Sequence, residues 1–288
     1  MNATLRNGNC VPFVGLGTFK IRGKEEVYNA LKAAFDAGYR LIDTAAVYRN
    51  EGDIGDCLPE LLSGHNLKRS DIFITSKLGP KDQGEGTCYS ACLKSIASLG
   101  CQYLDLYLIH WPGAQGRKPD DPVQRELRLG SWRDLIQLQK EGKVKNIGVS
   151  NFLQHHIQEL YNKTGIYPEV LQTEHHPHLV QTDLIRFCEE TGIFYQAYSS
   201  LGTTTQDNQI LTDPVVTEVS KKLKKSVSQI LLKWAIQQRI GVLPKSSNPR
   251  HIQENIDLFS FQIPEEDINL LNSLNKGRHY CWNPKDIA

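Results

Sequence analysis

The sequence predicts an α/β protein in which eight parallel strands, each followed by a helix, close into a single barrel. Three observations indicate this fold: eight short apolar runs, amphipathic segments between them, and a length of 288 residues. Nearly continuous apolar character is typical of strands covered on both faces. Because an α/β barrel commonly uses about 250 residues for one core, we expect residues 1–288 to form one domain.

The expected strands follow one another along the chain. They are residues 14–19, 40–44, 72–77, 104–110, 146–151, 170–174, 194–199 and 241–245. Between them lie segments with apolar residues at three- and four-residue steps. Four of these segments precede a glycine, which commonly ends a helix: Gly38, Gly100, Gly142 and Gly192. Another helical stripe covers residues 223–234. This alternation favours a closed (β/α)8 TIM barrel over an open sheet.

Two elements lie outside the repeat. Asn7 and Gly8 form an Asn-Gly pair between two short apolar runs, which predicts an N-terminal β-hairpin. We expect this hairpin to cover one end of the barrel. Pro264 suits the first turn of a helix and predicts an extra C-terminal helix.

The charge of the chain is balanced. Its 33 Lys and Arg residues and 32 Asp and Glu residues give a formal net charge of +1. Such a chain has no broad basic field for nucleic acid or anionic lipid, and no segment approaches the roughly 18 apolar residues of a membrane helix. The start is polar, unlike a signal peptide, and the seven cysteines form no Cys-x-x-Cys pair. We therefore expect a cytoplasmic protein with reduced thiols and no nucleic-acid or membrane partner.

Polar residues stand at the carboxyl ends of seven of the eight expected strands. In a barrel these ends meet on one face, where the chemistry lies. One polar residue there is usually a capping or loop group, but a converging set predicts a site. The set comprises Asp43, Lys77, His110, Ser150, Asn151, Gln172, Tyr198, Lys245 and Ser246.

Tyr48 falls on the loop that follows Asp43, above the same face. A tyrosine with an ordinary pKa of about 10 is a poor acid at neutral pH, but a nearby ammonium lowers that pKa. Lys77 supplies the ammonium, and Asp43 keeps it charged. With His110 these residues form a proton-transfer set rather than the nucleophile and base of an acyl-transfer site.

The motifs around these residues resemble those of the aldo-keto reductase family. They cover essentially the whole chain, at residues 15–19, 43–51, 76–78, 105–112, 148–152, 172–177, 197–199 and 244–246. The resemblance implies a barrel that binds NADPH and reduces aldehydes or ketones to alcohols. It makes Tyr48 the general acid that protonates the carbonyl oxygen, tuned by Asp43 and Lys77. His110 would hydrogen-bond the carbonyl and orient it.

The resemblance also assigns the cofactor and substrate contacts. The nicotinamide end would meet Ser150, Asn151, Gln172 and Tyr198, and the phosphate and adenine end would meet Lys245 and the residues after it. The implied cofactor-binding residues are Thr18, Phe19, Ser150, Asn151, Gln172, Tyr198, Ser199, Leu201, Lys245, Ser246, Arg250, Glu254 and Asn255. The implied substrate-lining residues are Phe19, Val47, Gly79, Trp111 and Trp282.

The cofactor site has two notable sequence features. A neutral chain that holds a phosphate needs local cations, and Lys245 and Arg250 near an expected helix start provide them. The family usually has arginine where this chain has His251, which leaves the strength of the preference for NADPH over NADH open. The glycines at residues 15–17 lack the third glycine of a Rossmann dinucleotide site.

Two departures from the family concern the substrate pocket. Gly79 stands where many relatives place a tryptophan, so we expect a wider wall there. The tail after Asn275 is short, and Tyr280 or Trp282 is the residue expected to reach the site. The sequence does not identify the physiological carbonyl substrate.

Other functions stay open from the sequence. His175 and His176 are neighbours on a strand and point to opposite faces, so we expect no metal site there. The alternative function is a cofactor-binding structural or redox-sensing scaffold with little turnover, including a partner subunit of a membrane complex, because a fold does not determine a function. The intact proton-transfer set favours a monomeric enzyme that acts on small carbonyl compounds.

Overall fold

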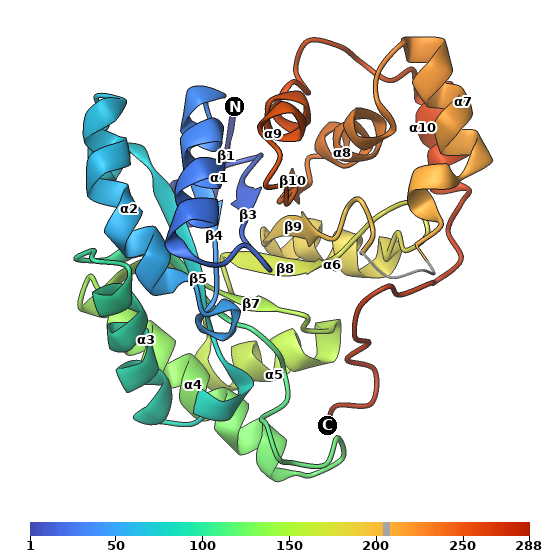
Figure 1. Cartoon of the computed structure of the whole chain (residues 1–288). Helices are drawn as coiled ribbons and strands as arrows, with labels where there is room; N and C mark the ends of the chain where they lie inside the picture. Colours follow the sequence, from blue (N-terminus) through green and yellow to red (C-terminus); the bar gives the residue numbers. More distant parts are fainter. Residues whose placement is uncertain (204–207) are drawn as a thin grey trace.

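Eight parallel strands form one curled sheet, which confirms the predicted fold class. The computed structural model describes residues 1–203 and 208–288. The strands are β3 (Leu16–Gly17), β4 (Leu41–Asp43), β5 (Phe73–Leu78), β6 (Leu104–Ile109), β7 (Val144–Ser150), β8 (Val170–Glu174), β9 (Phe194–Tyr198) and β10 (Gly241–Val242). Each strand is hydrogen-bonded to the next in the chain, and the sheet curls around the centre of the molecule (Figure 1).

The barrel closes between its first and last strands. Val14 and Val242 form a parallel bridge, and the N–H of Gly15 donates to the carbonyl of Val242 over 3.0 Å. The N–H of Gly17 donates to the carbonyl of Pro244, also over 3.0 Å. A Cβ on Gly17 would lie only 2.9 Å from the carbonyl oxygen of Leu243, so this close approach requires glycine.

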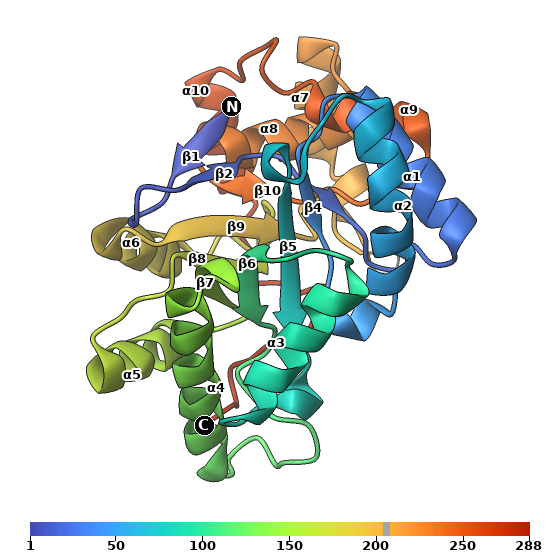
Figure 2. The same cartoon turned by 90° about the vertical axis from the view of Figure 1, so that its left-hand side faces the viewer.

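Helices cover the outside of the barrel (Figure 2). They are α1 (Lys24–Asp36), α2 (Glu51–Gly64), α3 (Thr87–Ser98), α4 (Val123–Lys140), α5 (Gln154–Thr164), α6 (Thr182–Thr191), α7 (Pro214–Leu223), α8 (Val227–Gln237), α9 (Pro249–Ile256) and α10 (Glu265–Asn272). The extra C-terminal helix is α10, and Pro264 is its N-cap. That prediction is confirmed.

The apolar stripe over residues 223–234 belongs to two helices rather than one. Lys224 follows α7 in the left-handed conformation, with φ of 52°. Ser226 then caps α8, because its hydroxyl accepts a hydrogen bond from the N–H of Gln229 over 3.2 Å. The sequence pattern missed this break because the apolar spacing continues across it.

Helix α2 has a composition that conceals it in the sequence, since it contains Gly52, Gly55 and Pro59. Packing explains one of these residues. A Cβ on Gly55 would lie 2.4 Å from the carbonyl oxygen of Ser98, so the glycine lets α2 approach the end of α3. Tertiary contact therefore outweighs the low helix propensity of glycine.

The predicted hairpin is present, with β1 (Asn2–Thr4) paired to β2 (Cys10–Pro12). Its loop is closed by the N–H of Leu5, which donates to Asn9 over 2.8 Å. Leu5 and Val11 pack with Leu41 and Phe73, which begin β4 and β5. The hairpin therefore covers the amino end of the barrel, as expected, and leaves the carboxyl end for the site.

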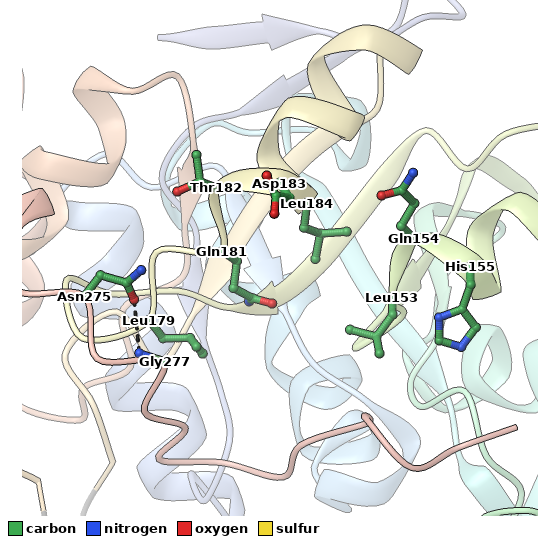
Figure 3. Close-up of a pocket in the computed structure, with 10 residues that line it drawn as sticks. All are labelled: Leu153, Gln154, His155, Leu179, Gln181, Thr182, Asp183, Leu184, Asn275 and Gly277. Atoms are coloured by element: carbon green, nitrogen blue, oxygen red, sulfur yellow. Dashed lines mark hydrogen bonds between the residues drawn. The ribbon is translucent and has the colours of Figure 1, made fainter.

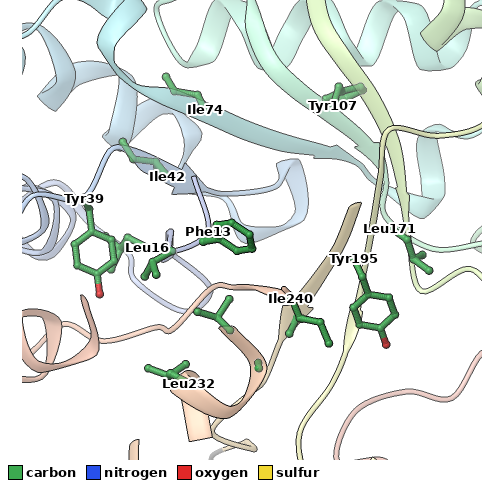
Figure 4. Packing of buried hydrophobic residues seen from close by; sticks show 14 of the residues in the cluster. Phe13, Leu16, Tyr39, Ile42, Ile74, Tyr107, Leu171, Tyr195, Leu232 and Ile240 are labelled. Atoms are coloured by element: carbon green, nitrogen blue, oxygen red, sulfur yellow. The ribbon is translucent and has the colours of Figure 1, made fainter. Parts of the chain in front are cut away.

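Side chains alternate between the inside and the outside of the barrel. Leu41, Phe73 and Leu106 belong to the interior cluster, whereas their neighbours Ile42, Ile74 and Tyr107 pack in the outer cluster with the helices (Figure 4). This period of two continues to the carboxyl ends of the strands. It directs the polar residues near those ends toward one face.

Candidate active site

The buried ammonium of Lys77 is the centre of the predicted proton-transfer set. Lys77 lies in β5, and its Nζ is 2.5 Å from Oδ1 of Asp43 at the end of β4. Nζ also donates to the carbonyl of Thr44 over 2.9 Å and lies 3.4 Å from the hydroxyl of Tyr48. Tyr48 is the last residue of a short 3-10 helix, Ala46–Tyr48. The structure thus brings Asp43, Lys77 and Tyr48 into one connected group.

His110 lies beside this group, directly after β6. Its ring meets the ring of Tyr48 edge-on, with centroids 5.7 Å apart. The ring of Phe19 lies tilted against the ring of Tyr48, with centroids 5.1 Å apart. The Nδ1 atom of His110 is buried without a hydrogen-bond partner among the described residues. Such a group favours a ligand or water at this place.

Burial and charge set the protonation of these groups. Burial raises the pKa of Tyr48, and the opposing effect of Lys77 is smaller. The expected lowering by Lys77 is thus present, but the net direction is upward, which corrects the expectation from sequence. Burial lowers the pKa of Lys77, yet Asp43 and Tyr48 together hold it above its ordinary value. Lys77 therefore stays charged.

His110 is neutral at physiological pH. Burial, with a smaller effect of Lys77, lowers its pKa to about 3. A neutral imidazole has one N–H to donate and carries no charge into the site.

A hydrogen-bonded pair of glutamine side chains, which the sequence did not predict, holds the carboxylate of Asp43. The Nε2 of Gln172 donates to Oδ2 of Asp43 over 2.8 Å and to Oε1 of Gln196 over 3.0 Å. Because a carboxylate only accepts, these bonds determine which end of Gln172 faces Asp43. Gln172 lies in the middle of β8 rather than at its end. Gln196 could have been recognised in the sequence as a polar residue inside the apolar run of β9.

Three more predicted residues form a second group above β7 and β9. The hydroxyl of Tyr198 donates to Oδ1 of Asn151 over 2.6 Å. Nδ2 of Asn151 donates to the carbonyl of His110 over 2.9 Å and to the hydroxyl of Ser150 over 3.1 Å. Asn151 has a φ of 64°. This group is thus connected to the proton-transfer set through the backbone carbonyl of His110.

Most residues expected at the phosphate and adenine end lie around one cavity of about 370 Å³. Its lining includes Leu201, Lys245, Ser246, His251, Glu254 and Asn255. Arg250 does not line it. The Nε of Arg250 lies 3.4 Å from Oε1 of Glu254, and its side chain is 85% exposed. The structure therefore places His251, rather than Arg250, beside Lys245.

The remaining predicted residues lie close to the proton-transfer set. Thr18 is buried, and its hydroxyl donates to the carbonyl of Asp43 over 2.9 Å. Ser199 follows β9, and its hydroxyl lies 3.4 Å from the thiol of Cys281. Trp111 and Trp282 meet edge-on with ring centroids 6.1 Å apart. The C-terminal tail thus reaches this group.

The space beside Gly79 is not an open gap. A Cβ there would lie 3.2 Å from Cγ1 of Val47 and 3.3 Å from Oδ2 of Asp82. Val47 itself is 40% exposed. The expected widening of the pocket at Gly79 is therefore limited by these two side chains.

A second cavity, of about 510 Å³, lies apart from the predicted residues (Figure 3). It is bounded by the starts of α5 and α6 and by Asn275 and Gly277 after α10. Within residues 1–203 and 208–288, no three His, Cys, Asp or Glu side chains are placed to hold a metal ion. No helix in the same part of the chain is long and apolar enough to cross a membrane.

Comparisons with known protein families, sequences and structures all point to the same family. Residues 14–276 match the Aldo/keto reductase family. The chain is 41% identical to a glyoxal reductase of Bacillus subtilis over 283 residues, covering 98% of this chain and 96% of the relative. An aldo-keto reductase from a Medee basin deep-sea metagenome library superposes with a TM-score of 0.90 at 36% identity, covering 99% of both chains. An aldo-keto reductase of Bombyx mori, solved in complex with NADP, gives 0.89 at 35% identity and covers 98% of this chain and 94% of its own.

Proposed function

The chain belongs to the aldo/keto reductase family, and we propose that it reduces aldehydes or ketones to alcohols with NADPH, with Tyr48 as the general acid. One observation carries the proposal: the buried Nζ of Lys77 lies between the carboxylate of Asp43 and the hydroxyl of Tyr48. A tyrosine hydroxyl beside a held ammonium is suited to donate a proton, because the ammonium stabilises the phenolate that remains.

The residues of this chain fit a phosphate-bearing dinucleotide. The cavity beside Lys245 offers an ammonium, the hydroxyl of Ser246 and the imidazole of His251. It lies before the first turn of α9, where the positive end of the helix dipole favours anions. At the other end, Asn151, Tyr198 and Gln172 form a polar group within reach of the proton-transfer set. When bound, NADPH would supply the hydride.

The side chains of the protein then have separate tasks. Tyr48 donates its hydroxyl proton to the carbonyl oxygen of the substrate. Lys77 stabilises the resulting phenolate, and Asp43 keeps Lys77 charged and in place. His110, neutral because its pKa is about 3, donates a hydrogen bond that orients the carbonyl without competing as an acid.

We propose small aldehydes and dicarbonyls as the first substrates to examine. The B. subtilis relative is named glyoxal reductase, and Val47 with Asp82 limits the space beside Gly79. We also propose that the protein acts as a monomer in the cytoplasm. All seven cysteines are free thiols, which supports a reducing compartment.

Replacing Tyr48 tests the proposal. Tyr48→Phe should lower kcat by about 10²–10⁴, the usual scale for a lost general acid, while the Kd for NADPH, measured by fluorescence quenching, stays within about twofold of wild type. Tyr89→Phe is the matched control, because it removes only a surface hydroxyl that donates to Glu141. It should retain full activity.

Two outcomes would overturn the proposal. Full activity of Tyr48→Phe toward a reactive aldehyde would remove Tyr48 as the acid. Wild-type protein that binds NADPH but reduces no member of a panel of aldehydes, dicarbonyls, quinones and ketosteroids would favour the scaffold function instead.

A further inference from the structure

The carboxylate of Glu174 holds a distant part of the chain. Glu174 ends β8 and is almost completely buried. The N–H of Tyr280 donates to its Oε1 over 2.7 Å, and the N–H of Cys281 lies 3.2 Å from both oxygens. Nδ1 of His279 lies 3.2 Å from Oε2. One buried carboxylate thus binds three consecutive residues of the segment 276–288, called here the C-terminal strap.

The charge of Glu174 is retained because its partners outweigh the effect of burial. Burial alone would raise its pKa, but His176, His279 and the N–H of Tyr280 lower the pKa to about 2. His176 contributes from the barrel side, with Nε2 3.0 Å from Oε1. Glu174 is therefore an ionised acceptor across the physiological pH range, and charged acceptors make the stronger hydrogen bonds.

A second set of contacts determines which strap side chain faces which way. The hydroxyl of Tyr280 lies 2.8 Å from Nδ1 of His178, whose Nε2 lies 3.0 Å from Asp213. The N–H groups of Lys276 and Arg278 donate to the carbonyl of His178 over 3.1 and 3.0 Å. Tyr280 is thus directed to His178, so Trp282 is the tail aromatic that reaches Trp111.

Beyond these contacts the strap passes over the active site. The thiol of Cys281 lies 3.4 Å from the hydroxyl of Ser199, next to Tyr198. The ring of Trp282 packs edge-on against Trp111, the residue after His110, yet is 82% exposed. The last residues are bound on the far side, where the N–H of Ala288 donates to Pro119 over 2.8 Å. The strap therefore spans the carboxyl end of the barrel.

Glu174 lies on the same face of β8 as Gln172, two residues earlier, because side chains alternate along a strand. Gln172 binds Asp43 of the proton-transfer set, whereas Glu174 binds the strap. Strand β8 thus positions both Asp43, through Gln172, and the C-terminal strap, through Glu174. Exposed apolar rings such as Trp282 and the half-exposed Phe19 suit a substrate with an aromatic or bulky apolar substituent.

We propose that Glu174 is a positioning residue that sets substrate selectivity: it holds the strap so that Cys281 and Trp282 form one wall of the substrate site. The inference rests on the proposed reductase function. It concerns carbonyl compounds with an aromatic substituent, which contact this wall, in contrast to glyoxal, which is too small to need it.

Glu174→Gln tests the proposal while keeping the shape of the side chain. A glutamine offers one acceptor oxygen and turns an NH2 group toward the strap N–H groups, so the strap loses hydrogen bonds to a charged acceptor. We expect the KM for benzaldehyde to rise about tenfold with kcat nearly unchanged, and kcat/KM for glyoxal to stay within about twofold. Hydrogen exchange of residues 279–288 should become faster, and the Kd for NADPH should not change.

Two variants keep the test decisive if Glu174→Gln folds poorly. His279→Ala removes one partner of Glu174 from its more exposed side and should give a smaller change in the same direction. Trp282→Ala should reproduce the rise in KM for benzaldehyde without faster exchange of residues 279–281. The matched control is Glu169→Gln, a buried carboxylate just before β8 that accepts from the hairpin residue Asn7. It should change neither selectivity nor exchange of the strap.

The outcomes separate this inference from the proposed function. Unchanged exchange of the strap in both Glu174→Gln and His279→Ala, or an equal loss toward benzaldehyde and glyoxal, would overturn the role of Glu174. If wild-type protein reduces neither substrate, the proposed function fails. Faster exchange in the variants would then still support the fastening of the strap but not its part in selectivity.

Discussion

Removing the charge of Asp43 should destabilise the protein, because it leaves the ammonium of Lys77 buried without its counter-ion. In Asp43→Asn, Lys77 keeps neutral acceptors, namely an amide oxygen at residue 43, the carbonyl of Thr44 at 2.9 Å and the hydroxyl of Tyr48 at 3.4 Å, but loses its negative counter-charge. Breaking a buried ion pair by removing one partner costs about 3–5 kcal/mol. At about 2 °C per kcal/mol for a chain of this size, we expect the Tm to fall by about 6–10 °C at pH 7.

The loss should depend on pH. In wild type the pKa of Lys77 lies above its ordinary value of 10.5, so the ion pair stabilises the fold below that pH and is lost as the pH rises through the folded-state pKa. In Asp43→Asn, burial lowers the pKa of Lys77, and above this lowered value the variant no longer buries a charge. The difference in stability is therefore largest near neutral pH and narrows as the pH rises from the lowered pKa of Lys77 in the variant toward about pH 10 and above.

Thermal unfolding followed by circular dichroism at pH 7 and pH 10 measures both effects. Asp36→Asn is the control, since Asp36 is half exposed and pairs near the surface with Lys32 at 2.8 Å and His65 at 3.0 Å. It should leave the Tm nearly unchanged, because water and salt screen an exposed ion pair. The double variant Asp43→Leu with Lys77→Met should recover much of the loss, because an apolar pair avoids the buried charge. Equal Tm values for Asp43→Asn and Asp36→Asn would show that the buried ion pair does not stabilise the fold.

Four other predictions follow from particular contacts. His251→Arg places a guanidinium in the cavity beside Lys245 and should tighten NADPH binding about tenfold, with less effect on NADH. Arg250→Ala removes an exposed side chain and should change neither Kd by more than about twofold; a large loss of NADPH affinity there would return the phosphate contact to Arg250. Gly55→Ala brings a Cβ to 2.4 Å from the carbonyl oxygen of Ser98 and should cost about 1–3 kcal/mol in chemical denaturation, whereas Gly52→Ala, with open space around it, should not destabilise α2. The pKa values of His110, His156 and His175 are about 3 in the folded protein, so the unfolded chain binds more protons below pH 6.5. Stability should then fall from pH 7 to pH 5, by up to about 1.4 kcal/mol per pH unit for each histidine; a constant Tm over this range would contradict it.

The strands were more readable from the sequence than the helices were. An apolar run such as residues 104–110 is long enough to mark a strand covered on both sides, and all eight runs correspond to strands β3 to β10. Helix α2 could be expected only from the repeat of strands and helices, because Gly52, Gly55 and Pro59 hide its periodicity. The break at Lys224 was missed because apolar spacing does not record a left-handed residue.

The barrel and the residues near the carboxyl ends of its strands could be inferred from the amino-acid sequence alone. Parallel strands in a closed barrel bring those ends to one face, so Asp43, Lys77 and His110 could be grouped from their places in the apolar runs. The grouping came from the apolar runs and from the polar residues that end them, which are local properties of the chain.

How these side chains are held depends on contacts between distant segments of the chain. The bonds from Gln172 to Asp43 and Gln196, and those from Glu174 to Tyr280 and Cys281, join segments that no local pattern relates. The turn of α9 likewise decided that His251, not Arg250, faces the cavity beside Lys245. Local periodicity specifies which face of a strand or helix a residue occupies, whereas a hydrogen-bond partner depends on where distant segments come to lie after the core has packed.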